Sequence, residues 1–157
     1  MADLAFLEAY VAISEVKARY CRTLDTKDWA GYADVFTEDV ILDTTPAGGY
    51  LTRGREEAVR IVRSSVETAI TAHQVHSPEI RLDGDTAYVI WAMQDRVVWG
   101  EDRRERMGNY GHTGYGHYRE RYVKQGGRWR IAEQELSRLH VDIHMTPPID
   151  MHTRRPG

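Results

Sequence analysis

The hydrophobic pattern of the chain changes its period near Ala72, and this change limits the folds that the chain can adopt. Upstream, apolar residues recur every three or four positions over residues 3–25 and again over residues 54–70, which predicts two amphipathic helices. Downstream, apolar and polar residues alternate, which predicts β-strands. Helices followed by antiparallel strands predict an α+β domain with the helices packed on one face of a curved sheet.

The predicted strands follow one another in short succession. The segment 72–82 is interrupted by Pro78, which marks an edge or a bulge because proline cannot donate to a sheet. The strongest alternation runs from Thr86 to Trp99. The other predicted elements are a turn at 83–85, a charged loop at 100–109, a strand at 110–124, a hairpin turn at 125–127 and a strand at 128–142.

The helical half of the sequence also contains a predicted helix cap and a polar helix face. Thr26 is expected to cap a short helix that carries Asp28 in its first turn. Charged residues such as Glu15, Lys17 and Arg22 fall mostly away from the apolar stripe of the first helix. A strand beginning at Val40 and a turn at 46–49 are predicted before the second long helix.

Size and composition bound the kind of protein. The 157 residues suit one domain, assigned to residues 1–144, followed by a tail at 145–157 that is either disordered or a strap across a neighbour. The net charge of −3 argues against a nucleic-acid partner. The lack of a long apolar run argues against a membrane partner. The single cysteine, Cys21, favours a reducing compartment, so a cytoplasmic location is expected.

Polar residues on predicted inward faces are the candidates for chemistry, because burying such groups is costly unless a partner compensates. Each has an ordinary structural explanation when taken alone, as core residue or fixed ion pair. Their convergence in one domain favours a catalytic site. The candidates are Tyr20 and Asp25 in the first helix, His73 and Asp95 in the central strands and Arg138 in the last strand.

The sequence offers no comparable pattern for a metal or a cofactor. His73 and His76 are three apart on a predicted strand, so they point to opposite faces, and His112 and His117 are separated by parity in the same way. Nucleotide-binding glycine motifs and the serine-hydrolase elbow are absent from the sequence. We therefore expect chemistry without a metal or cofactor.

The candidates lie in motifs that resemble the SnoaL-like branch of the nuclear transport factor two-like superfamily. The similarity runs from Ser14 to His144 and is greatest to the bile-acid 7α-dehydratase group, with scytalone dehydratase and the lindane dehydrochlorinase more distant. The tyrosine that precedes the aspartate of the scytalone enzyme is Leu24 here. The matching segments are KARYCRTLDTKDW around Tyr20 and Asp25, HQVHSPEI from His73, WAMQD ending at Asp95 and ELSRLH around Arg138.

This resemblance implies a cone-shaped, cystatin-like α+β barrel with a deep pocket between sheet and helices, and a catalytic site formed by all five residues. The implied activity is dehydration of a hydroxylated cyclic substrate such as a steroid or polyketide. His73 would act as the base and Asp25 would fix its tautomer. Tyr20 and Asp95 would handle the hydroxyl or hold a carbonyl, and Arg138 would neutralise a carboxylate.

Two other functions stay open at this point. The same cavity would serve a ketosteroid-type isomerase or an epoxide hydrolase, and the domain could instead be a non-catalytic ligand-binding or assembly subunit. The partner in each case is a small hydrophobic cyclic molecule. A homo-oligomer, a trimer before a dimer, is also expected, because the outer face of the sheet would otherwise expose Tyr88, Ile90 and Tyr118.

Overall fold

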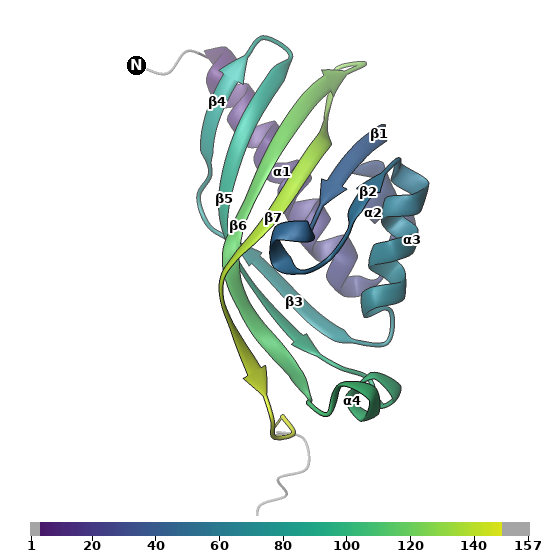
Figure 1. Ribbon diagram of the computed structural model, residues 1–157. Helices are drawn as coiled ribbons and strands as arrows, with labels where there is room; N and C mark the ends of the chain where they lie inside the picture. Colours follow the sequence, from purple (N-terminus) through teal and green to yellow (C-terminus); the bar gives the residue numbers. More distant parts are fainter. Residues whose placement is uncertain (1–3, 149–157) are drawn as a thin grey trace, which may run out of the picture.

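A computed structural model describes residues 4–148 of the chain (Figure 1). Its helical elements are α1 (Leu4–Thr26), α2 (Trp29–Asp34), a 3₁₀ turn η1 (Thr45–Ala47), α3 (Arg55–Val66) and α4 (Glu101–Met107). Its strands are β1 (Phe36–Asp43), β2 (Leu51–Arg53), β3 (Ile70–Val75), β4 (Glu79–Asp83), β5 (Thr86–Val98), β6 (Gly111–Gln125) and β7 (Arg128–His144).

The strands form one sheet in the order β2-β1-β7-β6-β5-β3, with β4 also pairing with β5. Neighbouring strands are antiparallel except β1 and β7, which run parallel. Figure 1 shows that the sheet is strongly curved, that α1 passes behind the upper parts of β5, β6 and β7, and that α4 lies at the far end of the sheet. The predicted α+β class, with helices on a curved sheet, is confirmed.

The apolar stripe of α1 supplies the helical side of the core. Ile13, Val16 and Leu24 are at most 3% exposed, as the helical spacing requires. They pack against the inward face of the sheet, where Val89 and Trp91 of β5 are equally buried. This packing fixes α1 along the sheet and places the carboxyl end of α1 beside β3.

The sequence-based element boundaries need three corrections. The strand expected to begin at Val40 begins at Phe36. The N-cap of α2 is Asp28, whose Oδ1 accepts a hydrogen bond from the Gly31 amide, while Thr26 ends α1 and donates to the Arg22 carbonyl. Residues 100–109 contain helix α4, with Glu101 and Asp102 in its first turn. The acidic charges of Glu101 and Asp102 suit the positive end of the helix dipole. In the sequence, the many charged residues of the segment 100–109 hid this sign of a helix.

Pro78 separates β3 from β4, so the expected interruption of the strand at 72–82 is confirmed. Among residues 4–148, the structure has no helix with both the length and the apolarity that a membrane crossing requires. The single domain at 1–144 stays a prediction, and most of the tail at 145–157 lies outside the described residues.

Candidate active site

The register of three strands brings polar residues into one row on the inward face of the sheet. His73 of β3 lies opposite Asp95 of β5, and Asp95 lies opposite Gly114 of β6. Directly paired residues on antiparallel strands share a face. Arg138 of β7 pairs one inward position further along, opposite Gly116. Residues 65 positions apart in sequence therefore meet across four strands.

Asp25 reaches this row from the end of α1. The helix stops because Lys27 adopts a left-handed backbone with φ of 60°, a common way for helices to end. The Lys27 ammonium donates to the Thr71 hydroxyl at 2.9 Å, and that hydroxyl donates to Oδ1 of Asp25 at 2.8 Å. The end of α1 is thereby tied to β3.

Asp25 and His73 form a close pair. Nδ1 of His73 lies 2.7 Å from Oδ1 of Asp25, and the His73 backbone amide donates to Oδ2 at 2.8 Å. A carboxylate accepts hydrogen bonds, so the proton of the neutral imidazole belongs on Nδ1. Nε2 then carries a lone pair. This is the arrangement by which a carboxylate orients a general base.

Burial raises the pKa of Asp25, but the hydrogen bonds and charge from His73 and the bond from Thr71 outweigh burial and leave its pKa below the ordinary value of 3.8. A carboxyl with a depressed folded-state pKa stabilises the protein above its unfolded pKa. That contribution disappears as the pH falls through the folded-state pKa.

We expect this linkage to be visible in Asp25→Asn. The melting temperature of the wild type, minus that of the variant, should be largest above the ordinary value of 3.8 and should shrink steadily below it. Thermal melts of both proteins from neutral pH to about pH 2 measure the difference. A difference that does not change with pH would show that Asp25 is not stabilised as a carboxylate.

Arg138 clamps Asp95 with a bidentate ion pair. Nη1 donates to Oδ1 at 2.9 Å and Nη2 donates to Oδ2 at 2.5 Å. The Asp95 side chain is only 5% exposed, so the guanidinium compensates for its desolvation. Oδ2 of Asp95 also lies 4.0 Å from Nε2 of His73. A positive charge formed on His73 would therefore face a fixed carboxylate.

Gly114 provides the room for this ion pair. A Cβ atom at position 114 would overlap Arg138 Nη1 and Asp95 Oδ1. We expect Gly114→Ala to lower the free energy of unfolding by about 1–3 kcal/mol, the usual cost of overpacking, as measured by urea denaturation. A glycine with positive φ, such as Gly84 at 57°, cannot serve as the control. Ala92→Ser, on the opposite face of β5, is the control variant. An equal loss in its free energy of unfolding would contradict the role of Gly114.

His112 also lies at the site, and it is not among the five residues predicted from the sequence. Nε2 of His112 lies 3.8 Å from Oδ1 of Asp95, and its ring lies against that of Trp99 at 5.5 Å between centroids. The position of His112 along β6 indicates that its side chain faces inward. His112 shares the inward face with Gly114, Tyr118 and Glu120, opposite the inward residues of β5.

Tyr20 is buried in a different part of the interior. Its hydroxyl donates to Oε1 of Gln134 at 3.2 Å, and its ring packs on Tyr118 at 5.8 Å. Burial, the first of several causes, raises its pKa well above the ordinary value. The structure thus brings Asp25, His73, Asp95 and Arg138 together by direct contacts, and the catalytic role expected for Tyr20 stays a prediction.

A buried ion pair lies beneath Tyr20. Lys17 donates to Glu120 at 2.6 Å, and neither side chain has any exposed surface. The Lys17 ammonium also lies 3.9 Å from the ring centroid of Tyr20 and 3.6 Å from that of Tyr118. The expectation that Lys17 falls away from the apolar stripe of α1 is therefore wrong. Lys17 is one turn from Ile13 and from Cys21 and shares their stripe.

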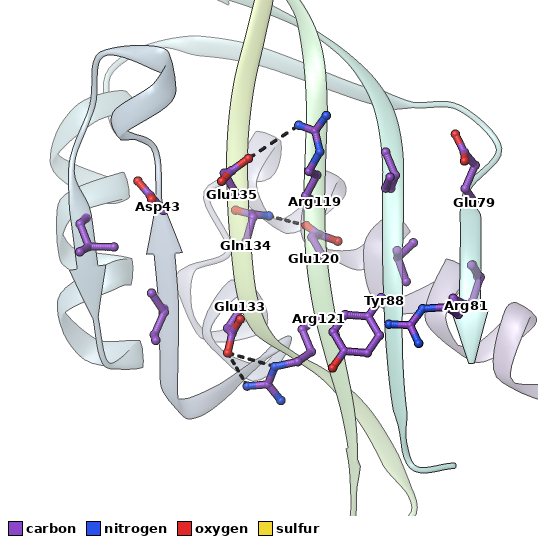
Figure 2. A pocket seen from close by; sticks show the side chains of 15 residues that line it. Asp43, Glu79, Arg81, Tyr88, Arg119, Glu120, Arg121, Glu133, Gln134 and Glu135 are labelled. Carbon is purple, nitrogen blue, oxygen red and sulfur yellow. Dashed lines mark hydrogen bonds and ion pairs between the residues drawn. The ribbon is translucent and has the colours of Figure 1, made fainter. Parts of the chain in front are cut away.

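A groove of about 750 Å³ lies on the outward face of the sheet. Figure 2 shows its labelled side chains standing on β4 to β7 and β1, with ion pairs joining Arg119 to Glu135 and Arg121 to Glu133. None of the five candidate residues lines it. The groove is therefore separate from the Asp25–His73 pair.

Tyr88 and Ile90 line this outward groove, as expected. Tyr118 does not: it is 2% exposed and faces the core, because it pairs with inward-facing Trp91. The homo-oligomer, with a trimer favoured over a dimer, stays a prediction.

Among the described residues, no group of three or more His, Cys, Asp or Glu side chains is arranged to hold a metal ion.

A family model for the SnoaL-like domain matches residues 5–135. The curated "Probable cyclase FGR4" of Gibberella zeae is 27% identical over 143 residues, which cover 85% of this chain and 93% of that protein.

Two solved structures illustrate the shared fold. A Novosphingobium aromaticivorans protein, provisionally assigned as a scytalone dehydratase, has a TM-score of 0.77 and 19% identity, with 95% of this chain and 96% of that one covered. The hexachlorocyclohexane dehydrochlorinase LinA-type3 of Novosphingobium barchaimii has a TM-score of 0.76 and 17% identity, with 94% and 100% covered.

Proposed function

Because this chain belongs to the SnoaL-like domain family, we propose that it is a cofactor-independent lyase that removes water from a hydroxylated cyclic substrate bearing a carbonyl. The observation that carries the proposal is the 2.7 Å contact between His73 Nδ1 and Asp25, because it leaves Nε2 as a base. The similarity to a cyclase, a dehydratase and a dehydrochlorinase supports an enzyme of the lyase or isomerase type.

The reaction begins with proton transfer to His73. Nε2 takes a proton from the carbon next to the substrate carbonyl, and the electron pair of the broken C–H bond enters an enolate. Asp25 accepts the Nδ1 hydrogen bond throughout and stabilises the imidazolium. The carboxylate of Asp95, 4.0 Å from Nε2, adds a second negative charge, moderated by Arg138.

Loss of the hydroxyl completes the reaction. The enolate pair forms the new C=C bond, and the C–O bond breaks with its electron pair on oxygen. The imidazolium of His73 can return its proton to that oxygen, so that water leaves and the base is regenerated. A single histidine then balances the reaction without a further acid. Asp95 suits the task of holding charge, since both of its oxygens accept from Arg138.

A mass-resolved screen tests this function. The purified protein is incubated with hydroxylated steroids and polyketide rings that carry a carbonyl. The masses and retention times of the products are measured by liquid chromatography and mass spectrometry. We expect a product lighter by one water. An unchanged mass with altered retention would identify an isomerase, a mass greater by one water would identify a hydrolase, and either result would contradict the lyase.

A further inference from the structure

We propose that the ring N–H of His112 is the hydrogen-bond donor to the substrate oxygen that gains negative charge when His73 takes the proton. This inference rests on the proposed function and adds a binding role to it. It assigns the two imidazoles of the site to opposite tasks, one as proton acceptor and the other as donor.

The first support is the state of the His112 ring in the structure. The side chain is 18% exposed, yet within residues 4–148 no hydrogen bond reaches either of its ring nitrogens. Partly buried polar groups normally have partners. Nε2 lies 3.8 Å from Asp95 Oδ1, which is beyond hydrogen-bond distance. The ring therefore keeps a free polar atom within the site.

The second support is the orientation of that atom. The ring packs against Trp99, with centroids 5.5 Å apart, and the guanidinium of Arg103 lies 4.3 Å from the Trp99 ring centroid. These contacts hold the imidazole with Nε2 toward Asp95. A proton on Nε2 faces the carboxylate favourably, whereas a lone pair there would be repelled. Nε2–H is thus the favoured tautomer.

The third support is the shared carboxylate. His73 Nε2 lies 4.0 Å from Oδ2 of Asp95, and His112 Nε2 lies 3.8 Å from Oδ1. Both imidazoles therefore border the same fixed group. Gly114 pairs with Asp95 and is the next inward position to His112 on β6, and the Arg138–Asp95 pair lies where a Cβ at Gly114 would be. A carbon acid held at His73 can present its oxygen toward His112.

The charge of the ring suits a donor. Burial lowers the pKa of His112 below 6.5, the charges of Arg138, His73 and Arg103 lower it further, and Asp95 opposes them. The net direction is downward, so the ring is neutral at pH 7. A neutral imidazole can stabilise an enolate oxygen by a hydrogen bond without losing its proton, as in some isomerases. Removing one such donor costs about 100- to 1,000-fold in kcat.

The ring itself can be observed without a substrate. Two-bond ¹H–¹⁵N NMR correlations of the full chain at pH 7 report the protonation of each imidazole nitrogen. We expect His112 to be neutral with its proton on Nε2. A charged ring, or a proton on Nδ1 alone, would overturn the inference whether or not the lyase function holds.

Kinetics test the role of the donor. His112→Phe keeps an aromatic ring against Trp99 but removes the N–H, and His112→Gln restores a donor. We expect the phenylalanine variant to lose about 100-fold or more in kcat with little change in KM, and the glutamine variant to regain at least about tenfold. His140→Phe, at a 64%-exposed side chain, is the matched control.

The outcomes separate the two proposals. Dehydration that needs His73 but survives His112→Phe within about threefold would overturn this inference and leave the lyase intact. Equal losses in His112→Phe and His112→Gln, with unchanged melting temperatures, would show that the ring matters for its shape and would also overturn it. Absence of dehydration in the wild type would overturn the lyase and with it the donor role of His112, whereas an NMR result against Nε2–H would overturn the donor role alone.

Discussion

Replacing His73 by alanine is expected to lower kcat at least about 100-fold, the usual contribution of a well-placed base. The variant loses Nε2, while the Asp25 carboxylate keeps the Thr71 hydroxyl and the backbone amide of residue 73 as donors. The fold should therefore survive, and far-ultraviolet circular dichroism and the melting temperature check this.

The design includes a matched control. His140→Ala removes an imidazole that is 64% exposed and paired with Asp142 at 2.8 Å, away from the Asp25–His73 pair. Its kcat should stay within about twofold of the wild type, as expected for a surface group outside the site. A His73→Ala variant with near-normal turnover would end the proposed mechanism.

Lys17→Met is expected to produce the largest loss of stability, about 3–5 kcal/mol in the free energy of unfolding. The substitution leaves the Glu120 carboxylate fully buried without a cation. Its two oxygens would keep only the Gln134 amide at 2.6 Å and the Tyr122 hydroxyl at 2.6 Å as donors. Urea denaturation of the variant measures the loss.

Two further variants show whether the burial of the pair is responsible. Lys17→Met combined with Glu120→Gln removes both charges and should recover much of the loss, because the remaining polar groups are neutral. Glu67→Gln breaks an exposed pair with Arg63 at 2.6 Å and should cost less than about 1 kcal/mol. A loss below about 1 kcal/mol in Lys17→Met would contradict the buried pair.

Periodicity was sufficient to predict the α+β class, and the parity of single strands placed three of the site residues on the inward face. His73 and Asp95 share that face with apolar neighbours, and Arg138 shares it with Leu136. The contact of His73 with Asp25 was predicted through the family resemblance, since a pattern along one element cannot tell which other element it meets.

Other features of the structure could be recognised only once the fold was known. Helical spacing puts Lys17 on the buried stripe, but its partner Glu120 is 103 positions away, and a lysine without a known partner is normally assigned to the surface. The place of His112 in the site follows from the pairing of β6 with β5, which the parity of His112 and His117 along one strand does not show. The Arg138–Asp95 pair joins β7 to β5 across β6, and no pattern along a single strand specifies such a contact.

The ring protonation of His73 tests the central claim most directly. At a pH where the ring is neutral, two-bond ¹H–¹⁵N correlations should show the proton on Nδ1, facing Asp25, and a bare Nε2. Asp25→Asn should weaken this preference. A wild-type ring that carries its proton on Nε2 would have no lone pair to offer the substrate, and that result would contradict the assignment of His73 as the base.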